Sequence, residues 1–234
     1  MVKVLLFDLD GTLLPMDQNV FVKECFSGYA KKMMPYGYKA DDIINAVIQG
    51  VGAMAKNDGK KTNEVVYWNK FAEILGEDIR KYEYVFEDFY NNEFQKLQNV
   101  CGFEPKAKEV IELAKERGFR VALATSPVFP KIATESRLRW AGFEPSDFEI
   151  VTTYEDYSFA KPNLGYYKEV TKILGVEPEE CVMVGNDVLE DMIASELGMK
   201  VFLLTDCIIN KKNQDTSEFA QGSYPELIDF VKNL

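Results

Sequence analysis

The chain has 234 residues and a mass of 26.7 kDa, which is enough for one large domain or for a core with a smaller inserted unit. Its 27 Lys and Arg residues and 38 Asp and Glu residues give a formal net charge of −11, which argues against a general nucleic-acid-binding or anionic-membrane surface. The chain contains no histidine, and this excludes every mechanism that uses imidazole as a base, nucleophile or metal ligand.

The first predicted element is a buried strand at residues 2–7, and a region of helices follows it. The strand is apolar at consecutive positions, as in a parallel strand that is covered on both faces. Residues 16–100 contain no convincing strand, but four segments have helical patterns. These segments are residues 18–33, 41–56, 63–75 and 78–98. In the last segment, aromatic and apolar side chains fall on one side, which is more typical of the core of a helical unit than of a cage around a ligand.

After residue 100, helices and strands alternate. Helical patterns that end at a glycine occur at residues 107–117, 131–141 and 166–174. Apolar runs typical of buried parallel strands occur at residues 119–124, 148–152, 181–184 and 201–204. Residues 206–223 are polar and predicted to form a loop, and residues 225–232 a final short helix.

This alternation predicts an α/β fold with a doubly wound, Rossmann-like parallel sheet. Residues 1–15 and 101–234 would form this core, and residues 16–100 would form a helical unit inserted after the first strand.

The four cysteines and the N-terminal segment indicate the cellular compartment in which the protein works. Cys25, Cys101, Cys181 and Cys207 are far apart in the sequence, so we expect buried apolar thiols in a reducing compartment rather than disulfides or a zinc site. The N-terminal segment lacks the basic start and small-residue cleavage site of a secretory signal, and no apolar stretch reaches the roughly 18 residues of a membrane span. We therefore expect a cytoplasmic protein.

The segment FDLDGTLL places Asp8 and Asp10 directly after the first predicted strand, and Gly11 allows a sharp turn out of it. Open α/β sheets bind their ligands outside the carboxyl ends of the strands, which is where these carboxylates would lie. Their close spacing requires a nearby cation or a retained proton. A plain turn after a strand would use the same residue types, so this segment alone does not establish a site.

Two further segments add hydroxyl groups and a cation. Thr125 and Ser126 follow a predicted strand, and because the next helix is expected to begin near Pro130, their hydroxyls would be free to donate to an anion. Lys161 lies in a loop before a helix. Alone it would be assigned to the solvated surface.

The fourth segment, VGNDVLED, follows another predicted strand. Asp187 and Asp191 are spaced to share one face of a helix, an arrangement that favours a bound cation. Acidic residues in a first helical turn also complement the helix dipole, which is the alternative explanation.

In this order, the four segments closely resemble the motifs of the haloacid dehalogenase-like hydrolase superfamily: DxDG followed by Thr or Val, a strand-ending Ser or Thr, a Lys, and a strand with a paired acidic motif. The resemblance implies that the inserted unit is a helical C1 cap, which closes over the site and selects the leaving group. The stretch between Ser126 and Ala160 is too short for the larger cap that some members carry there.

The resemblance also implies a role for each residue. Asp8 would be the nucleophile that becomes an aspartyl-phosphate, and Asp10 would be the general acid and then the base. Thr125 and Ser126 would bind phosphate oxygens, and Lys161 would link the nucleophile to the phosphate. The cofactor would be Mg²⁺, held by Asp8, the main-chain carbonyl of Asp10 and the fourth motif. Mg²⁺ suits such an all-oxygen site.

The fourth motif departs from the family pattern in one position. The family commonly has an acid directly after the glycine, where this chain has Asn186. We expect Asp187 to be a direct metal ligand and Asp191 to act directly or through water, with Asn186 as an alternative ligand through its neutral carbonyl oxygen.

These implied roles predict a Mg²⁺-dependent hydrolase that acts on a phosphomonoester of a small metabolite. The alternatives are a phosphomutase with the same residues, or a non-catalytic module that binds a phosphorylated ligand. Asp10 disfavours a dehalogenase or phosphonate hydrolase, because the dehalogenase relatives replace this residue. We expect neither a nucleic-acid nor a membrane partner, and the sequence does not distinguish a monomer from a homodimer.

Overall fold

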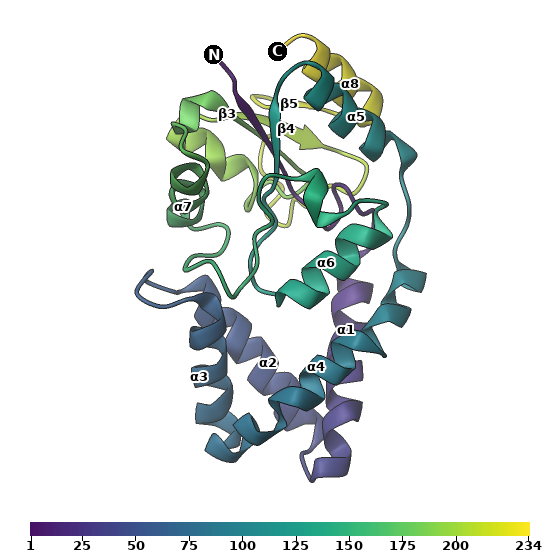
Figure 1. Cartoon of the computed structure of the whole chain (residues 1–234), viewed down its shortest axis with the longest axis vertical. Coiled ribbons are helices and arrows are strands. Elements are labelled where there is room, and N and C mark those ends of the chain that lie inside the picture. Colours follow the sequence, from purple (N-terminus) through teal and green to yellow (C-terminus); the bar gives the residue numbers. More distant parts are fainter.

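The computed structural model describes all 234 residues, as a sheet-containing core and a group of helices at one end (Figure 1). Both termini lie at the end of the core that faces away from these helices. None of the helices combines the length and the apolar character that crossing a membrane requires.

The core contains a five-stranded sheet in which every neighbouring pair is parallel, in the order β2-β1-β3-β4-β5. The strands are β1 (Val4–Phe7), β2 (Arg120–Leu123), β3 (Cys181–Gly185), β4 (Lys200–Leu204) and β5 (Ala220–Gly222). The central strands β1 and β3 are buried on both faces, which is why their sequences are apolar at consecutive positions. The prediction of a doubly wound α/β core is confirmed.

Helices cover both faces of the sheet. They are α5 (Pro105–Glu116), α6 (Lys131–Trp140), α7 (Leu164–Leu174) and α8 (Tyr224–Lys232). Leu5 and Phe7 of β1 point into a cluster with α5, α6 and α8, whereas Val4 and Leu6 point into a cluster with α7.

The inserted unit consists of four main helices, and we call it the cap. The helices are α1 (Gln18–Met33), α2 (Ala40–Ala55), α3 (Asn63–Leu75) and α4 (Glu83–Asn91). Its apolar side chains belong to the same cluster of 46 buried residues as those of α5, α6 and α8, so the cap and one face of the sheet share a continuous hydrophobic core.

A buried amide also joins the cap to the core. Asn63, at the start of α3, is fully buried, and its Nδ2 donates to the carbonyl oxygens of Pro127 and Phe159, each at 3.1 Å. Asn57 donates to the Asn63 Oδ1 at 2.9 Å, which satisfies the other end of the amide. One cap residue thus holds two core loops.

The structure differs from the sequence-based prediction in three segments. The helix expected at 78–98 is α-helical only over α4, between 3-10 segments at Glu77–Tyr82 and Phe94–Val100. It breaks after α4, where Asn92 leaves the helical backbone region and its side chain bonds to Asp88. The strand expected at 148–152 lies beside β2 as an irregular segment with a single bridge, Leu123–Val151. The loop expected at 206–223 contains β5.

The cysteine prediction is confirmed in part. All four thiols are free, but only Cys25 and Cys181 are buried, and Cys101 and Cys207 are half-buried.

Candidate active site

The carboxyl ends of β1, β2 and β3 meet at one edge of the sheet. The strand register pairs Phe7 with both Leu123 and Val184, so the residues that follow these three lie side by side. A cavity of about 210 Å³ lies between these strand ends and the cap. All eight residues that the sequence indicated line it: Asp8, Asp10, Thr125, Ser126, Lys161, Asn186, Asp187 and Asp191.

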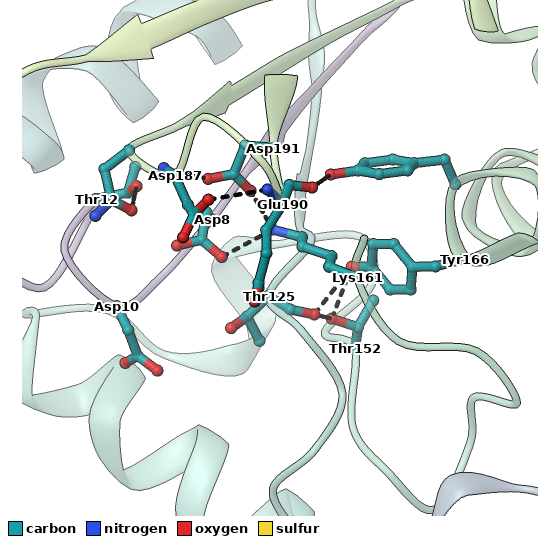
Figure 2. A network of polar contacts seen from close by, with 12 residues as sticks. Asp8, Asp10, Thr12, Thr125, Thr152, Lys161, Tyr166, Asp187, Glu190 and Asp191 are labelled. Atoms are coloured by element: carbon teal, nitrogen blue, oxygen red, sulfur yellow. Dashed lines mark hydrogen bonds and ion pairs between the residues drawn. The ribbon is translucent and has the colours of Figure 1, made fainter. Parts of the chain in front are cut away.

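Lys161 is the centre of the site and is not a solvated surface charge. Its Nζ donates to Asp8 Oδ1 at 2.9 Å and to Asp191 Oδ1 at 2.6 Å, and its side chain is 1% exposed (Figure 2). Burial alone would lower the pKa of Lys161, but the carboxylates of Asp191 and Asp8 outweigh it and hold that pKa well above its ordinary value. The lysine therefore stays cationic between two carboxyl groups.

The fourth motif holds its acids in a turn rather than on a helix, so the expected shared helical face is wrong. Asp187 Oδ1 accepts from the N–H groups of Leu189 and Glu190 at 2.8 and 2.9 Å, and Asp191 Oδ2 accepts from the Asp187 N–H at 2.9 Å. A side chain at Gly185 would overlap with Asp191, so the glycine is required for this packing. Burial raises the pKa of Asp191 despite the opposing effect of Lys161.

Asn186 links two loops. The Thr12 hydroxyl donates to Asn186 Oδ1 at 3.0 Å, and Asn186 Nδ2 donates to the Cys207 carbonyl at 2.7 Å. Gly11, with φ of +83°, passes so close to this amide that a Cβ there would overlap with it. Both ends of the amide are thus occupied by protein groups.

Thr125 presents an unused hydroxyl to the cavity. Its carbonyl accepts from the hydroxyls of Thr152 at 2.6 Å and Tyr166 at 2.9 Å, which fixes the backbone, while its own hydroxyl makes no hydrogen bond within the protein. The next helix, α6, begins at Lys131 with Pro130 as its N-cap, so Thr125 and Ser126 are free of capping, as expected.

Asp10 lies apart from the cluster around Lys161 (Figure 2). One of its oxygens forms an ion pair with Arg137 of α6, a residue that the sequence analysis missed. The sequence could have indicated Arg137 only by its position, because it lies among the buried residues of α6, where a charge needs a partner. Burial raises the pKa of Asp10, and Arg137 only partly offsets this effect.

Glu190 is a second cavity residue that the sequence analysis missed. Burial raises its pKa to about 8. Only its place inside the VGNDVLED segment could have indicated from the sequence that Glu190 lines the cavity.

The carboxylates do not form a ready-made cage for a metal, because no three acidic or cysteine side chains converge closely enough. However, no protein group bonds to Asp8 Oδ2 or Asp187 Oδ2, and the Asp10 carbonyl accepts one bond, from Gln18, which leaves a lone pair free. Mg²⁺ is commonly held by one or two carboxylates with water and substrate phosphate, so this donor set fits it.

Comparisons with known proteins agree on one family. A model of the haloacid dehalogenase-like hydrolases matches residues 2–197. The glyceraldehyde 3-phosphate phosphatase of Methanocaldococcus jannaschii is 30% identical over 241 residues, which cover 100% of this chain and 99% of the relative.

Solved structures share the fold. A HAD phosphatase from Thermococcus onnurineus has a TM-score of 0.61 at 21% identity over 98% of each chain. An L-2-haloacid dehalogenase from Xanthobacter autotrophicus has a TM-score of 0.58 at 15% identity over 100% of each chain.

Proposed function

Because the chain belongs to the haloacid dehalogenase-like hydrolases, we propose that it is a Mg²⁺-dependent phosphomonoester hydrolase of a small phosphorylated metabolite, acting through an aspartyl-phosphate. The observation that carries this proposal is the convergence of Asp8, Lys161 and the free Thr125 hydroxyl in one cavity. These groups are a nucleophile, a buried cation and a hydrogen-bond donor, which phosphoryl transfer requires.

In the first step, the Asp8 carboxylate would attack phosphorus, the bond from phosphorus to the ester oxygen would break, and Asp10 would give a proton to the leaving oxygen. Lys161 would neutralise charge on Asp8 and on the transferring group, and Thr125 and Ser126 would donate to the phosphate oxygens. In the second step, Asp10 would take a proton from water as that water attacks phosphorus and releases Asp8 and inorganic phosphate.

Asp8, the carbonyl of Asp10 and Asp187 would hold the metal, which would supply charge neutralisation when bound. Asp191 would act through its bonds to Lys161 and to the Asp187 N–H, which hold the lysine and the fourth-motif turn in place. Asn186 would keep its linking role.

The name of the relative from Methanocaldococcus jannaschii supports glyceraldehyde 3-phosphate as the first substrate to test. The experiment measures phosphate release from this ester, from 4-nitrophenyl phosphate and from a panel of metabolite monoesters. Each is measured with and without Mg²⁺, for the wild type and for Asp8→Asn. We expect turnover that requires Mg²⁺ and is abolished in Asp8→Asn. Isomerisation of sugar phosphates without phosphate release would instead indicate the phosphomutase alternative, and binding without turnover the non-catalytic one.

A further inference from the structure

Arg137 is a fully buried cation inside the wall of the active site. Its Nη1 donates to Asp10 Oδ2, its Nη2 donates to Thr134 Oγ1 at 3.3 Å, and its Nε donates to the Ala133 carbonyl at 3.3 Å. The guanidinium also lies 4.2 Å from the ring centre of Phe129, a residue that lines the cavity. Arg137 is therefore held by several contacts.

Asp10 is the only carboxylate that pairs with Arg137. Burying a cation without a partner is costly, whereas a planar guanidinium with fixed donors can hold one carboxylate oxygen in a defined place. The arrangement is thus suited to orienting Asp10.

The two oxygens of Asp10 have opposite surroundings. Oδ2 is bound by Arg137, whereas Oδ1 is the only buried side-chain polar atom in the protein that has no hydrogen-bond partner. An unpaired buried oxygen costs free energy unless another group, such as a substrate, satisfies it. Asp10 also lines the active-site cavity, where the substrate would bind.

We propose that Arg137 is the positioning residue of Asp10: it holds Oδ2 so that Oδ1 is left to exchange the proton with the leaving-group oxygen. This inference rests on the proposed hydrolase function. In the first step, the bond from phosphorus to the ester oxygen breaks and that oxygen takes the proton from Oδ1. In the second step, Oδ1 takes a proton from the attacking water. The bond from Arg137 to Oδ2 is kept in both steps.

The test compares two esters of similar size whose leaving oxygens differ in basicity. The phenolate of 4-nitrophenyl phosphate leaves without a proton, whereas the alkoxide of 4-nitrobenzyl phosphate needs one. The value of kcat/KM reports the step in which the phosphoryl group is transferred to Asp8. Loss of a residue that positions Asp10 should therefore lower kcat/KM mainly for 4-nitrobenzyl phosphate. A merely structural arginine would slow both esters equally.

For Arg137→Met, we expect kcat/KM to fall about 100-fold for 4-nitrobenzyl phosphate and about threefold or less for 4-nitrophenyl phosphate. Arg137→Lys keeps a buried cation but lacks the planar donor fork. It should show a smaller fall in kcat/KM that is again larger for 4-nitrobenzyl phosphate, which provides the test if the Met variant is unstable. Arg139→Met, on the same helix but 47% exposed, is the matched control and should leave both esters unaffected.

The second arm combines Arg137→Met with Asp10→Asn, which has no acidic proton to give. If Arg137 acts through Asp10, adding Arg137→Met to Asp10→Asn costs at most about twofold more on 4-nitrobenzyl phosphate. Equal losses for both esters, or losses that multiply in the double variant, would overturn the inference. If the wild type hydrolyses no ester of the wider panel, the proposed function itself is wrong.

Discussion

At the scale of single residues, the site is defined by buried charges whose partners come from distant parts of the chain. Lys161 joins Asp8 and Asp191, which lie 153 and 30 residues away. Each carboxylate thereby gains a cation that its own segment does not contain.

Glu190 makes the stability of the metal-free protein depend on pH. Its pKa is raised by burial from an ordinary value of 4.5 to about 8 in the folded state, so between these values the unfolded chain has released a proton that the folded chain keeps. The free energy of unfolding should therefore fall as pH rises from about 4.5 to about 8, by up to roughly 1.4 kcal/mol per pH unit from this group.

We expect Glu190→Gln to make this decline shallower in urea unfolding series recorded at several pH values with EDTA present. The same change at the exposed Glu218 is the control and should leave the slope unaltered. A slope that Glu190→Gln does not change would show that other groups carry the dependence.

The sequence predicts which residues gather at the site but not how each is held. The strand ends indicated that Asp8 and Thr125 lie together, whereas Lys161, in a loop, was placed with them only by the resemblance to the family. The turn at 187–191 was not predictable from spacing, because the Asp187 and Asp191 side chains bond to backbone N–H groups and so compete with a helix. The contact between Arg137 and Asp10 joins residues 127 apart, and no local pattern encodes it.

At the scale of elements, an apolar cavity of about 200 Å³ lies beside the active-site cavity, between the cap helices and the core residues Val128, Phe129, Pro130 and Tyr154. Twelve of its 13 lining residues are hydrophobic, and it shares four of them with the active-site cavity. These four residues are Val22, Val51, Val128 and Phe129. A dry apolar cavity of about 150 Å³ already accepts a benzene-sized molecule. An apolar group attached to the phosphate therefore has space next to the chemistry.

We expect the wild type to favour an ester with a flat apolar group, such as phenyl phosphate, over methyl phosphate. Val47 of α2 lines only the apolar cavity, and Val47→Phe would fill it. The ratio of kcat/KM for phenyl phosphate to that for methyl phosphate should then fall about tenfold or more. Val65→Phe, at an exposed position of α3, is the control. An unchanged ratio in Val47→Phe would exclude this cavity from substrate binding.

The element boundaries were predictable where helical patterns have clear ends. The helix at 63–75 agrees with α3, and 18–33 agrees with α1. The strand β5 was not predictable, because its residues Ala220–Gly222 are largely exposed and pair with β4 only.

At the scale of the whole molecule, the shared cluster of 46 buried residues makes the cap and the core one packed body in this structure. An independent cap would need a hydrophobic core of its own, whereas here Trp140 of α6 packs against Phe94 of the inserted unit, with ring centres 5.3 Å apart. The sequence predicted two units because composition and pattern change at residues 16 and 100. It did not predict that their cores merge.

The two tryptophans lie in different parts: Trp68 in α3 of the cap, and Trp140 in α6 of the core at its contact with Phe94. We expect the fluorescence of Trp68→Phe and of Trp140→Phe to give urea transitions with the same midpoint, after correction for the stability of each variant by circular dichroism. Two separated transitions within one variant, one by fluorescence and one by circular dichroism, would show that the cap unfolds alone.

The buried amide of Asn63 sets the geometry of any cap movement. It bonds to carbonyls that lie two residues from Thr125 and two residues from Lys161, so a displacement of α3 at this point would leave buried groups unpaired at a cost of about 1–3 kcal/mol each. The start of α3 is therefore expected to be the pivot of the cap. Rotation about this pivot would displace the cap helices while the loops that carry Thr125 and Lys161 stay in place.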